Sequence, residues 1–91
     1  MTLRPFEIAN QLPSKAVNVV PMFGVHIWPD GDYYSGWWLN ARRHGMGTLS
    51  KATGEIYVGM WKKGFMDGEG HFVWHNGDEY IGGYKRGFRE V

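Results

Sequence analysis

Several features that commonly stabilise or classify proteins are missing from this chain of 91 residues. It has no cysteine, which excludes disulfide bonds and thiolate metal sites. Only four prolines accompany its fourteen glycines, and the glycines follow no three-residue period, which excludes a collagen-like chain. The longest apolar stretch, residues 16–25, is interrupted by Asn18, Pro21 and Gly24 and is too short to span a bilayer.

Neither sign of charge predominates, since the formal net charge is only +1. The first residues show no basic region followed by an apolar block, so no secretory signal is expected. What the chain does have is hydrophobic and aromatic side chains, at 43% and 16% of its residues. This composition is typical of a folded protein rather than a disordered one, and the length fits one small domain.

The glycines and aromatic residues recur with a period of 23 residues. The positions that repeat are Tyr34, Tyr57 and Tyr80; Gly36, Gly59 and Gly82; Trp38, Trp61 and Tyr84; Gly24, Gly47 and Gly70; and Gly31, Gly54 and Gly77. A fixed period of this length indicates a repeat array, in which each unit packs on its neighbours. We therefore predict such an array from Gly24 onward.

Each unit has the pattern of a β-hairpin. Residues 57–61 and 68–74 alternate as two strands, and turns are predicted at 62–64 and 75–78. A helix is excluded, because glycine every few residues would cost about 1 kcal/mol each relative to alanine. We predict that the turn glycines adopt positive φ. We also predict that the strand glycines leave room for aromatic rings from neighbouring strands to lie flat on the backbone.

These units resemble the MORN repeat. Its pattern, Y-x-G-x-W-x-x-G-x-x-x-G-x-G-x-x-x-x-x-x-G, is met in full by Tyr57, Gly59, Trp61, Gly64, Gly68, Gly70 and Gly77. The unit from Tyr34 departs from it at Ala41, where the turn glycine is expected, and at Trp37, where a polar residue is usual. On this resemblance the chain divides into an N-terminal extension, a partial unit, two full units and a partial unit, at 1–21, 22–33, 34–56, 57–79 and 80–91.

The resemblance implies an all-β fold, an elongated single-layer antiparallel ribbon of stacked 23-residue hairpins, with an irregular N-terminal extension. It also implies a role in interaction, since members of this family are linked to membrane apposition and phospholipid binding, and some bind peptide segments. The fold therefore does not settle the function. We expect an intracellular protein, whether cytoplasmic, cytoskeletal, ciliary or organelle-associated.

Residues suited to catalysis are poorly placed in this pattern. His71 and His75 share a strand face but would lie about 13 Å apart, too far to share a metal ion. The fragments Gly45-Met46-Gly47 and Gly68-Glu69-Gly70 do not continue as a phosphate-binding loop. We expect a non-catalytic protein with no cofactor, metal or small-molecule substrate, and no nucleic-acid partner.

Charged residues are separated between the two kinds of turn. Seven basic residues follow the Trp or Tyr of each unit: Arg42, Arg43, Lys62, Lys63, Lys85, Arg86 and Arg89. Acidic residues, namely Asp30, Asp32, Glu55, Asp78 and Glu79, lie at the other turns. Because successive hairpin turns alternate between the two edges of a ribbon, one edge should be positive. This edge could bind anionic phospholipids, phosphoinositides among them, or an acidic protein surface, or its charges could simply keep the turns solvated.

Large apolar side chains provide the second candidate surface, for protein subunits. The candidates are Trp37, Trp38, Met60, Trp61, Trp74 and Tyr84. Alternation directs Trp37 and Met60 away from the face that carries the repeat tyrosines, so both faces of the ribbon are predicted to be apolar. The preferred hypothesis is a small structural or adaptor subunit of a larger assembly. The alternative is a peripheral membrane module that binds anionic lipids through its basic turns.

Overall fold

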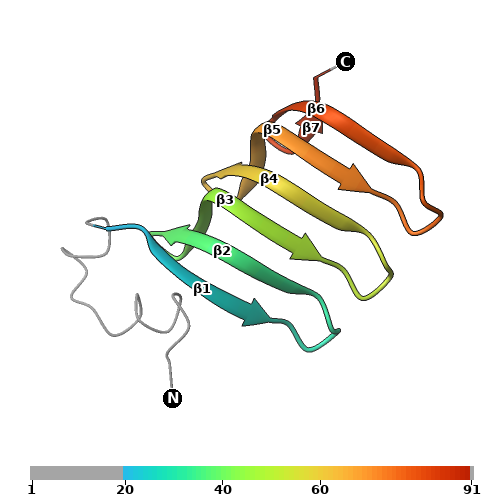
Figure 1. Cartoon of the computed structure of the whole chain (residues 1–91). Helices are drawn as coiled ribbons and strands as arrows, with labels where there is room; N and C mark the ends of the chain where they lie inside the picture. The colour runs from blue at the N-terminus through green and yellow to red at the C-terminus, as the bar shows by residue number, and fades with distance from the viewer. Residues whose placement is uncertain (1–19, 91) are drawn as a thin grey trace.

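The computed structural model describes residues 20–90, which form one antiparallel sheet measuring 43 × 26 × 15 Å. Its strands pair strictly in chain order, so the chain folds as a row of hairpins (Figure 1). They are β1 (Met22–Ile27), β2 (Tyr33–Leu39), β3 (Arg42–Ser50), β4 (Ile56–Lys62), β5 (Phe65–Val73), β6 (Glu79–Lys85) and β7 (Phe88–Arg89). The predicted all-β single-layer fold is confirmed. Of the predicted N-terminal extension, residues 1–19 lie outside the described residues.

Two kinds of turn alternate along the array, one at each edge of the sheet. Two-residue turns at 40–41, 63–64 and 86–87 have positive φ at both positions, which is the type I′ geometry that matches strand twist. Five-residue turns at 28–32, 51–55 and 74–78 each close with the first residue's N–H donating to the last residue's carbonyl, at 2.8 Å in all three. The turn predicted at 75–78 is of the longer kind, at 74–78, and in it Gly77 but not Asn76 has positive φ.

The strands are longer than the sequence pattern indicates. β5 begins at Phe65 instead of Gly68, and β4 includes Lys62, which was predicted to lie in a turn. The last unit, predicted to be partial, closes its hairpin with the two-residue strand β7. In the hairpins β2–β3 and β4–β5 the pairing shifts register opposite Trp37 and Met60, and the strands continue past this irregularity to the tight turns.

One face of the sheet, here called the aromatic face, forms the core. Tyr34 and Tyr57 are 0% and 1% exposed although no second sheet covers them. Each lies flat on glycines, so that a Cβ placed on Gly36 would lie 2.7 Å from the Tyr34 hydroxyl, and one on Gly47 would overlap the same ring. The predicted packing of aromatic rings on strand glycines is thereby confirmed.

Edge-to-face contacts join the rings of successive units. Tyr34 packs against Trp38 and Trp61 with ring centroids 5.0 and 5.5 Å apart, and Tyr57 repeats the arrangement with Trp61 and Tyr84 at 5.2 and 5.3 Å. The indole of Trp61 donates to the Gly47 carbonyl at 3.3 Å. Each aromatic residue therefore binds its own hairpin to the neighbouring one, and edge-to-face ring contacts of this kind add stability beyond area burial.

Ala41 occupies the second position of its type I′ turn with φ 62°, where the other tight turns have Gly64 and Gly87. A left-handed conformation costs a residue with a Cβ about 1 kcal/mol, partly offset by the greater unfolded-state entropy of glycine. We expect Ala41→Gly to raise the free energy of unfolding by about 0.5 kcal/mol, measured by urea titration. The matched change Gly64→Ala should lower it, and equal stabilities for both variants would contradict a conformational origin.

Candidate functional site

The face opposite the aromatic face, here called the outer face, is largely apolar on β1–β4. Strand pairing arranges its residues in three rows that run across the strands. The row nearest the tight turns, here called the apolar row, consists of Phe23, Trp37, Met46 and Met60. The middle row has Val25, Ser35, Thr48 and Val58, and the row nearest the five-residue turns has Ile27, Tyr33, Ser50 and Ile56. The surface is continuous over four strands.

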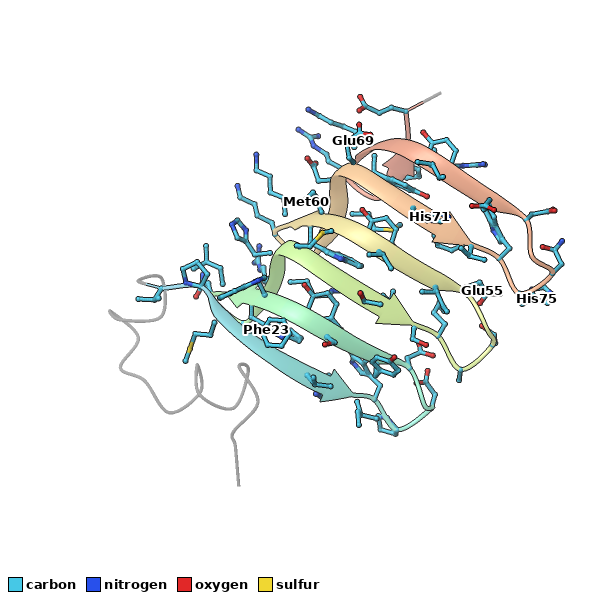
Figure 2. All side chains as sticks on the ribbon, viewed as in Figure 1. Phe23, Glu55, Met60, Glu69, His71 and His75 are labelled. Atoms are coloured by element: carbon cyan, nitrogen blue, oxygen red, sulfur yellow. The ribbon has the colours of Figure 1, made fainter. Side chains whose placement is uncertain are left out.

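Side chains of the apolar row are large and exposed. Phe23, Trp37, Met46 and Met60 are 60%, 42%, 53% and 40% exposed. Phe23 packs edge-on against Trp37 with ring centroids 5.7 Å apart, and the labelled Phe23 and Met60 mark the extent of the row in Figure 2. Aromatic residues and methionine are enriched at protein interfaces, and methionine adapts its shape to a partner.

The chemistry of the outer face changes at β5. Glu69 follows the apolar row on that strand, and His71 follows the middle row. His71 Nε2 lies 2.7 Å from Glu79 Oε1 on β6. Figure 2 shows Glu69 and His71 on β5, beyond Met60 as seen from Phe23. The apolar surface is therefore bounded on one side, as expected of a specific contact area with a polar rim.

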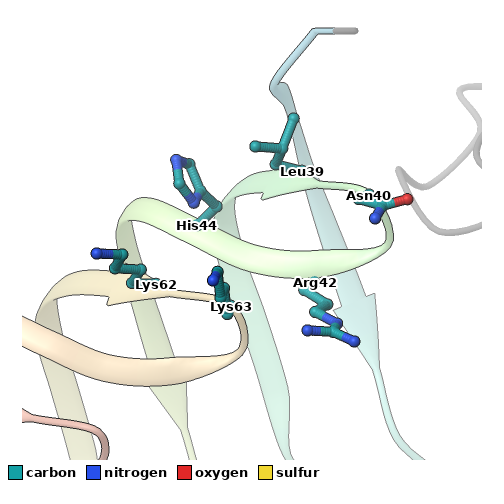
Figure 3. Close-up of a pocket in the computed structure, with 6 residues that line it drawn as sticks. All are labelled: Leu39, Asn40, Arg42, His44, Lys62 and Lys63. Atoms are coloured by element: carbon teal, nitrogen blue, oxygen red, sulfur yellow. The ribbon is translucent and has the colours of Figure 1, made fainter. Parts of the chain in front are cut away.

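The tight turns form a second surface, here called the basic tips: Arg42, Lys62, Lys63, Lys85 and Arg86. All five side chains are exposed, and none forms an ion pair within residues 20–90. Between the first two tips is a hollow of about 230 Å³ (Figure 3). It is lined by three cationic side chains and one imidazole, Arg42, Lys62, Lys63 and His44, together with Leu39 and Asn40. A neighbouring hollow of about 280 Å³ adds Lys85 and Arg86, together with Phe65 and the acidic Asp67.

Two of the seven predicted basic residues leave this edge. The tips curl over the aromatic face, where the Arg43 guanidinium lies 4.5 Å from the Trp61 ring and donates to the Gly64 carbonyl at 3.0 Å. Burial lowers the pKa of Arg43 from its usual value. Arg89 lies 5.4 Å from the Trp74 ring. These two arginines contribute cation–π contacts to the core side of the sheet rather than charge to the tips.

The MORN repeat family matches residues 22–33, 34–56, 57–79 and 80–91. The chain belongs to the MORN-repeat family. No curated protein matches it. MORN repeats are in general modules of interaction with proteins or membranes, and this is the level at which the family describes function. Among residues 20–90 there is no helix of the length and apolarity needed to cross a bilayer.

The MORN geometry divides the predicted partner-binding residues between the two faces. Trp37 and Met60 lie together on the outer face. Trp38, Trp61 and Tyr84 are 6%, 4% and 3% exposed in the core of the array, and Trp74 is half-buried beside Phe72 with ring centroids 4.7 Å apart. Sequence reasoning missed Phe23, Val25 and Met46, although the alternation of Met22–Ile27 places Phe23 and Val25 on the face of Trp37.

The histidines and acidic residues of the MORN turns are occupied locally. His75 Nδ1 lies 3.2 Å from a Glu55 oxygen, so it pairs with a different carboxylate from His71, whose partner is Glu79. Asp32 accepts from the backbone N–H of Ala52 at 2.7 Å. In the described residues no three histidine or acidic side chains gather where they could hold a metal ion.

Proposed function

We propose that this protein is a non-catalytic interaction module, a small structural or adaptor subunit that binds another protein through the outer face. The observation that carries the proposal is the continuous apolar row of four large, exposed side chains. Monomeric proteins rarely expose contiguous apolar areas of this kind, and such areas commonly mark contact sites.

Trp37 is the expected anchor of this contact. It lies in the middle of the row, between Phe23 and Met46. Its position also departs from the family pattern, where a polar residue is usual, so the array gains an aromatic side chain that the fold does not need. Tryptophan is prominent among residues whose truncation costs most in binding.

We expect Trp37→Ser to release the protein from the complex that it forms in its own cells. The native mass of tagged protein, measured at moderate salt, should fall from that of a large assembly to that of the free chain. Loss of a central anchor costs about 2 kcal/mol or more in affinity, or roughly 30-fold. Ile81→Ser is the matched control, because Ile81 is 72% exposed on the outer face but outside the apolar block.

A wild-type protein that elutes as a free small chain at every salt concentration would contradict the proposal. So would a complex that Trp37→Ser leaves intact. Circular dichroism of each variant separates loss of binding from loss of fold, since all seven strands should persist when an exposed side chain is replaced.

A second candidate function, the binding of anionic phospholipids, is favoured by the basic tips. Their five exposed cations lack ion-pair partners in residues 20–90 and border two hollows on one edge. Each cation near an anionic membrane surface contributes about 1 kcal/mol, and the attraction is screened by salt.

For this candidate the double variant Lys62→Glu plus Lys85→Glu is expected to reduce binding to vesicles of phosphatidylcholine with phosphoinositide by about 100-fold or more. Binding is measured by sedimentation at 0.05 and 0.3 M salt. Lys51→Glu, a charge reversal at an exposed five-residue turn on the opposite edge, is the control and should change binding little. Equal losses in both variants would indicate a general charge effect rather than a site.

A further inference from the structure

We propose that a second copy of this chain pairs its strand β1 along the free side of β6, so that the two copies form one continuous sheet, joined head to tail. This pairing goes beyond the proposed function, because it uses the two edges of the sheet and leaves the outer face free. It follows from the repeat positions of β1 and β6, which lie at opposite ends of the sheet (Figure 1).

The free side of β6 is the first of these edges. Its pairing with β7 covers only residues 84–85, and beyond them the N–H of Glu90 donates to the Gly83 carbonyl at 2.9 Å. Because the backbone groups of successive residues point to alternate sides of a strand, those of Ile81 and Glu79 point to the same side as the Gly83 carbonyl. In the described part of the chain no strand lies beside them there.

The outer side of β1 is the second edge. In the turn to β2 the N–H of Trp28 donates to the Asp32 carbonyl at 2.8 Å, so alternation directs the backbone groups of Val25 and Ile27 away from β2. Among the described residues β1 has β2 as its only neighbouring strand. Exposed edges are commonly protected by lysine or proline, and neither occurs within β1 or within residues 79–83 of β6.

β1 has the repeat positions that are missing beside β6. In the two complete hairpins the second strands, β3 and β5, are both nine residues long. By the period of 23 residues, the two residues of β7 correspond to the first two of these nine, and the six residues of β1 correspond to the last six. A copy of β1 beside β6 therefore completes the strand that β7 begins, without overlapping it.

The packing of tyrosine on glycine restricts which strand can pair with β6. Tyr34 covers Gly36 on its own strand and Gly47 on the facing strand. Tyr80 covers Gly82 in the same way, with a Cβ placed there 2.7 Å from its hydroxyl, yet it is partly exposed whereas Tyr34 is fully buried. A strand beside β6 must therefore have glycine opposite Gly82, because a Cβ at that point would meet the Tyr80 ring.

Gly24 of β1 meets this requirement. It has the same repeat position as the covered glycines of β3 and β5. With Gly24 opposite Gly82, the register of the complete hairpins places Val25 opposite Ile81. Both residues have their backbone groups on the free edges, so they can exchange two hydrogen bonds. Their side chains are 39% and 72% exposed and would lie side by side on the outer face of the joined sheet.

The proposed contact joins two different edges, so it does not close on itself. Every copy in such a row still offers β1 at one end and β6 at the other, which makes the association open-ended rather than dimeric. One pair of short strands forms a small contact area, so we expect weak association, with a dissociation constant on the order of 100 µM. The average mass of the protein should therefore rise steadily with concentration.

Two proline variants test the pairing, because proline lacks the N–H that each edge donates. Sedimentation equilibrium of the full chain between 5 and 500 µM should show the wild-type mass rising past that of a dimer. Ile81→Pro and Val25→Pro should each weaken association about tenfold or more, whereas Ile81→Thr, which keeps the N–H, should weaken it less than about threefold. An equal mixture of the two proline variants should form dimers and nothing larger, since one supplies an intact β1 and the other an intact β6.

A wild-type chain that stays monomeric at 500 µM would overturn the inference, as would a mixture of proline variants that does not associate. Association that is lost in Val25→Pro but kept in Ile81→Pro would overturn it too, because two copies would then pair through β1 alone. The proposed function fails separately, since Trp37→Ser alters the outer face and should leave head-to-tail association unchanged. A chain that associates in this way but forms no complex in cells would uphold the inference and not the subunit proposal.

The absence of cysteine allows the register to be measured without proline, in chains whose backbone is intact. Ile81→Cys chains mixed with Val25→Cys chains should form a mixed disulfide on air oxidation, because facing residues lie about 5.5 Å apart between Cα atoms. Ile27→Cys, two residues further along β1, is the matched control and should cross-link to Ile81→Cys at least about fivefold more slowly, since diagonal neighbours are about 7–8 Å apart. Equal rates for the two mixtures would overturn the proposed register.

Discussion

The chain with alanine in place of Gly47 is expected to be largely unfolded at room temperature. A Cβ at this position would overlap the ring of Tyr34, which lies flat on the glycine. The ring has nowhere to move, because Trp38 and Trp61 pack against it edge-on with centroids 5.0 and 5.5 Å away. A single methyl group therefore displaces the most buried side chain of the fold.

The expected cost combines two effects. Overpacking a filled site costs about 1–3 kcal/mol, and partial exposure of the displaced ring adds about 2 kcal/mol. The total, about 4 kcal/mol, is comparable to the whole free energy of unfolding of a domain of this size. Urea unfolding followed by tryptophan fluorescence measures it, and little or no cooperative transition is expected for the variant.

Gly83 provides the matched control. It is a strand glycine on the outer face, and a Cβ there would lie 3.0 Å from a carboxylate oxygen of Glu90 and 3.6 Å from one of Glu69, both at the ends of flexible side chains. We expect Gly83→Ala to change the free energy of unfolding by less than about 0.5 kcal/mol. If Gly47→Ala proved as stable as Gly83→Ala, the packing of tyrosine on glycine would not be what stabilises the array.

The second large effect is expected at alkaline pH. Burial raises the pKa of both Tyr34 and Tyr57 to about 12, from the ordinary value of 10.0. Burial also raises the pKa of Tyr84. A phenol whose pKa is higher in the folded state keeps its proton there while the unfolded chain loses it. Stability is therefore complete below pH 10 and is lost as the pH rises from 10 to 12.

The magnitude follows from the two-unit shift. Two pKa units correspond to about 2.7 kcal/mol for each tyrosine, or about 5 kcal/mol for the pair at most. Water lies close to every part of a single-layer sheet, so screening reduces this to about 3 kcal/mol. Because that is most of the stability of a small domain, we expect cooperative unfolding with a midpoint near pH 11.

Circular dichroism and tyrosinate absorbance, recorded on the same samples, provide the measurement. The two signals should change together if ionisation of the buried phenols unfolds the chain. In Tyr57→Phe the loss of stability between pH 10 and 12 should be about half as large as in the wild type, because one buried phenol is missing. The variant also lacks the hydrogen bond from the Tyr57 hydroxyl to the Met60 carbonyl, 2.9 Å long, so its free energy of unfolding at pH 7 should be lower by about 1 kcal/mol. Full tyrosine ionisation near pH 10 with an unchanged sheet would contradict the burial that the structure gives these rings.

The sequence permitted prediction of the hairpin array, because a period of 23 residues fixes which residues repeat and alternation fixes which face they occupy. Trp61 and Met60 were correctly placed on opposite faces by this reasoning. The alternation does not reveal that the tips curl over the aromatic face, because it carries no sign of the register shifts opposite Trp37 and Met60, and irregularities of this kind bend a strand.

For the same reason, the sequence did not show that the two arginines of the first tip have different surroundings. Arg42 is exposed, whereas Arg43 lies on the Trp61 ring. A signal was present in the repeat itself, because the residue equivalent to Arg43 in the next unit is Met66, which packs against the core. A basic residue that alternates with an apolar one at equivalent repeat positions indicates a side chain that packs, with its charge satisfied locally.

The strict pairing of each strand with its chain neighbours couples the length of the molecule to the number of contacts that it can make. Each 23-residue unit adds one hairpin, about 10 Å of length, and the same set of surface positions. Duplication of a unit would lengthen both the apolar row and the line of basic tips and would repeat the ring contacts between neighbouring hairpins, because each tyrosine covers the glycines of its own hairpin and packs against a ring of the next. Reach and valency therefore change together, in fixed increments, whenever units are gained or lost.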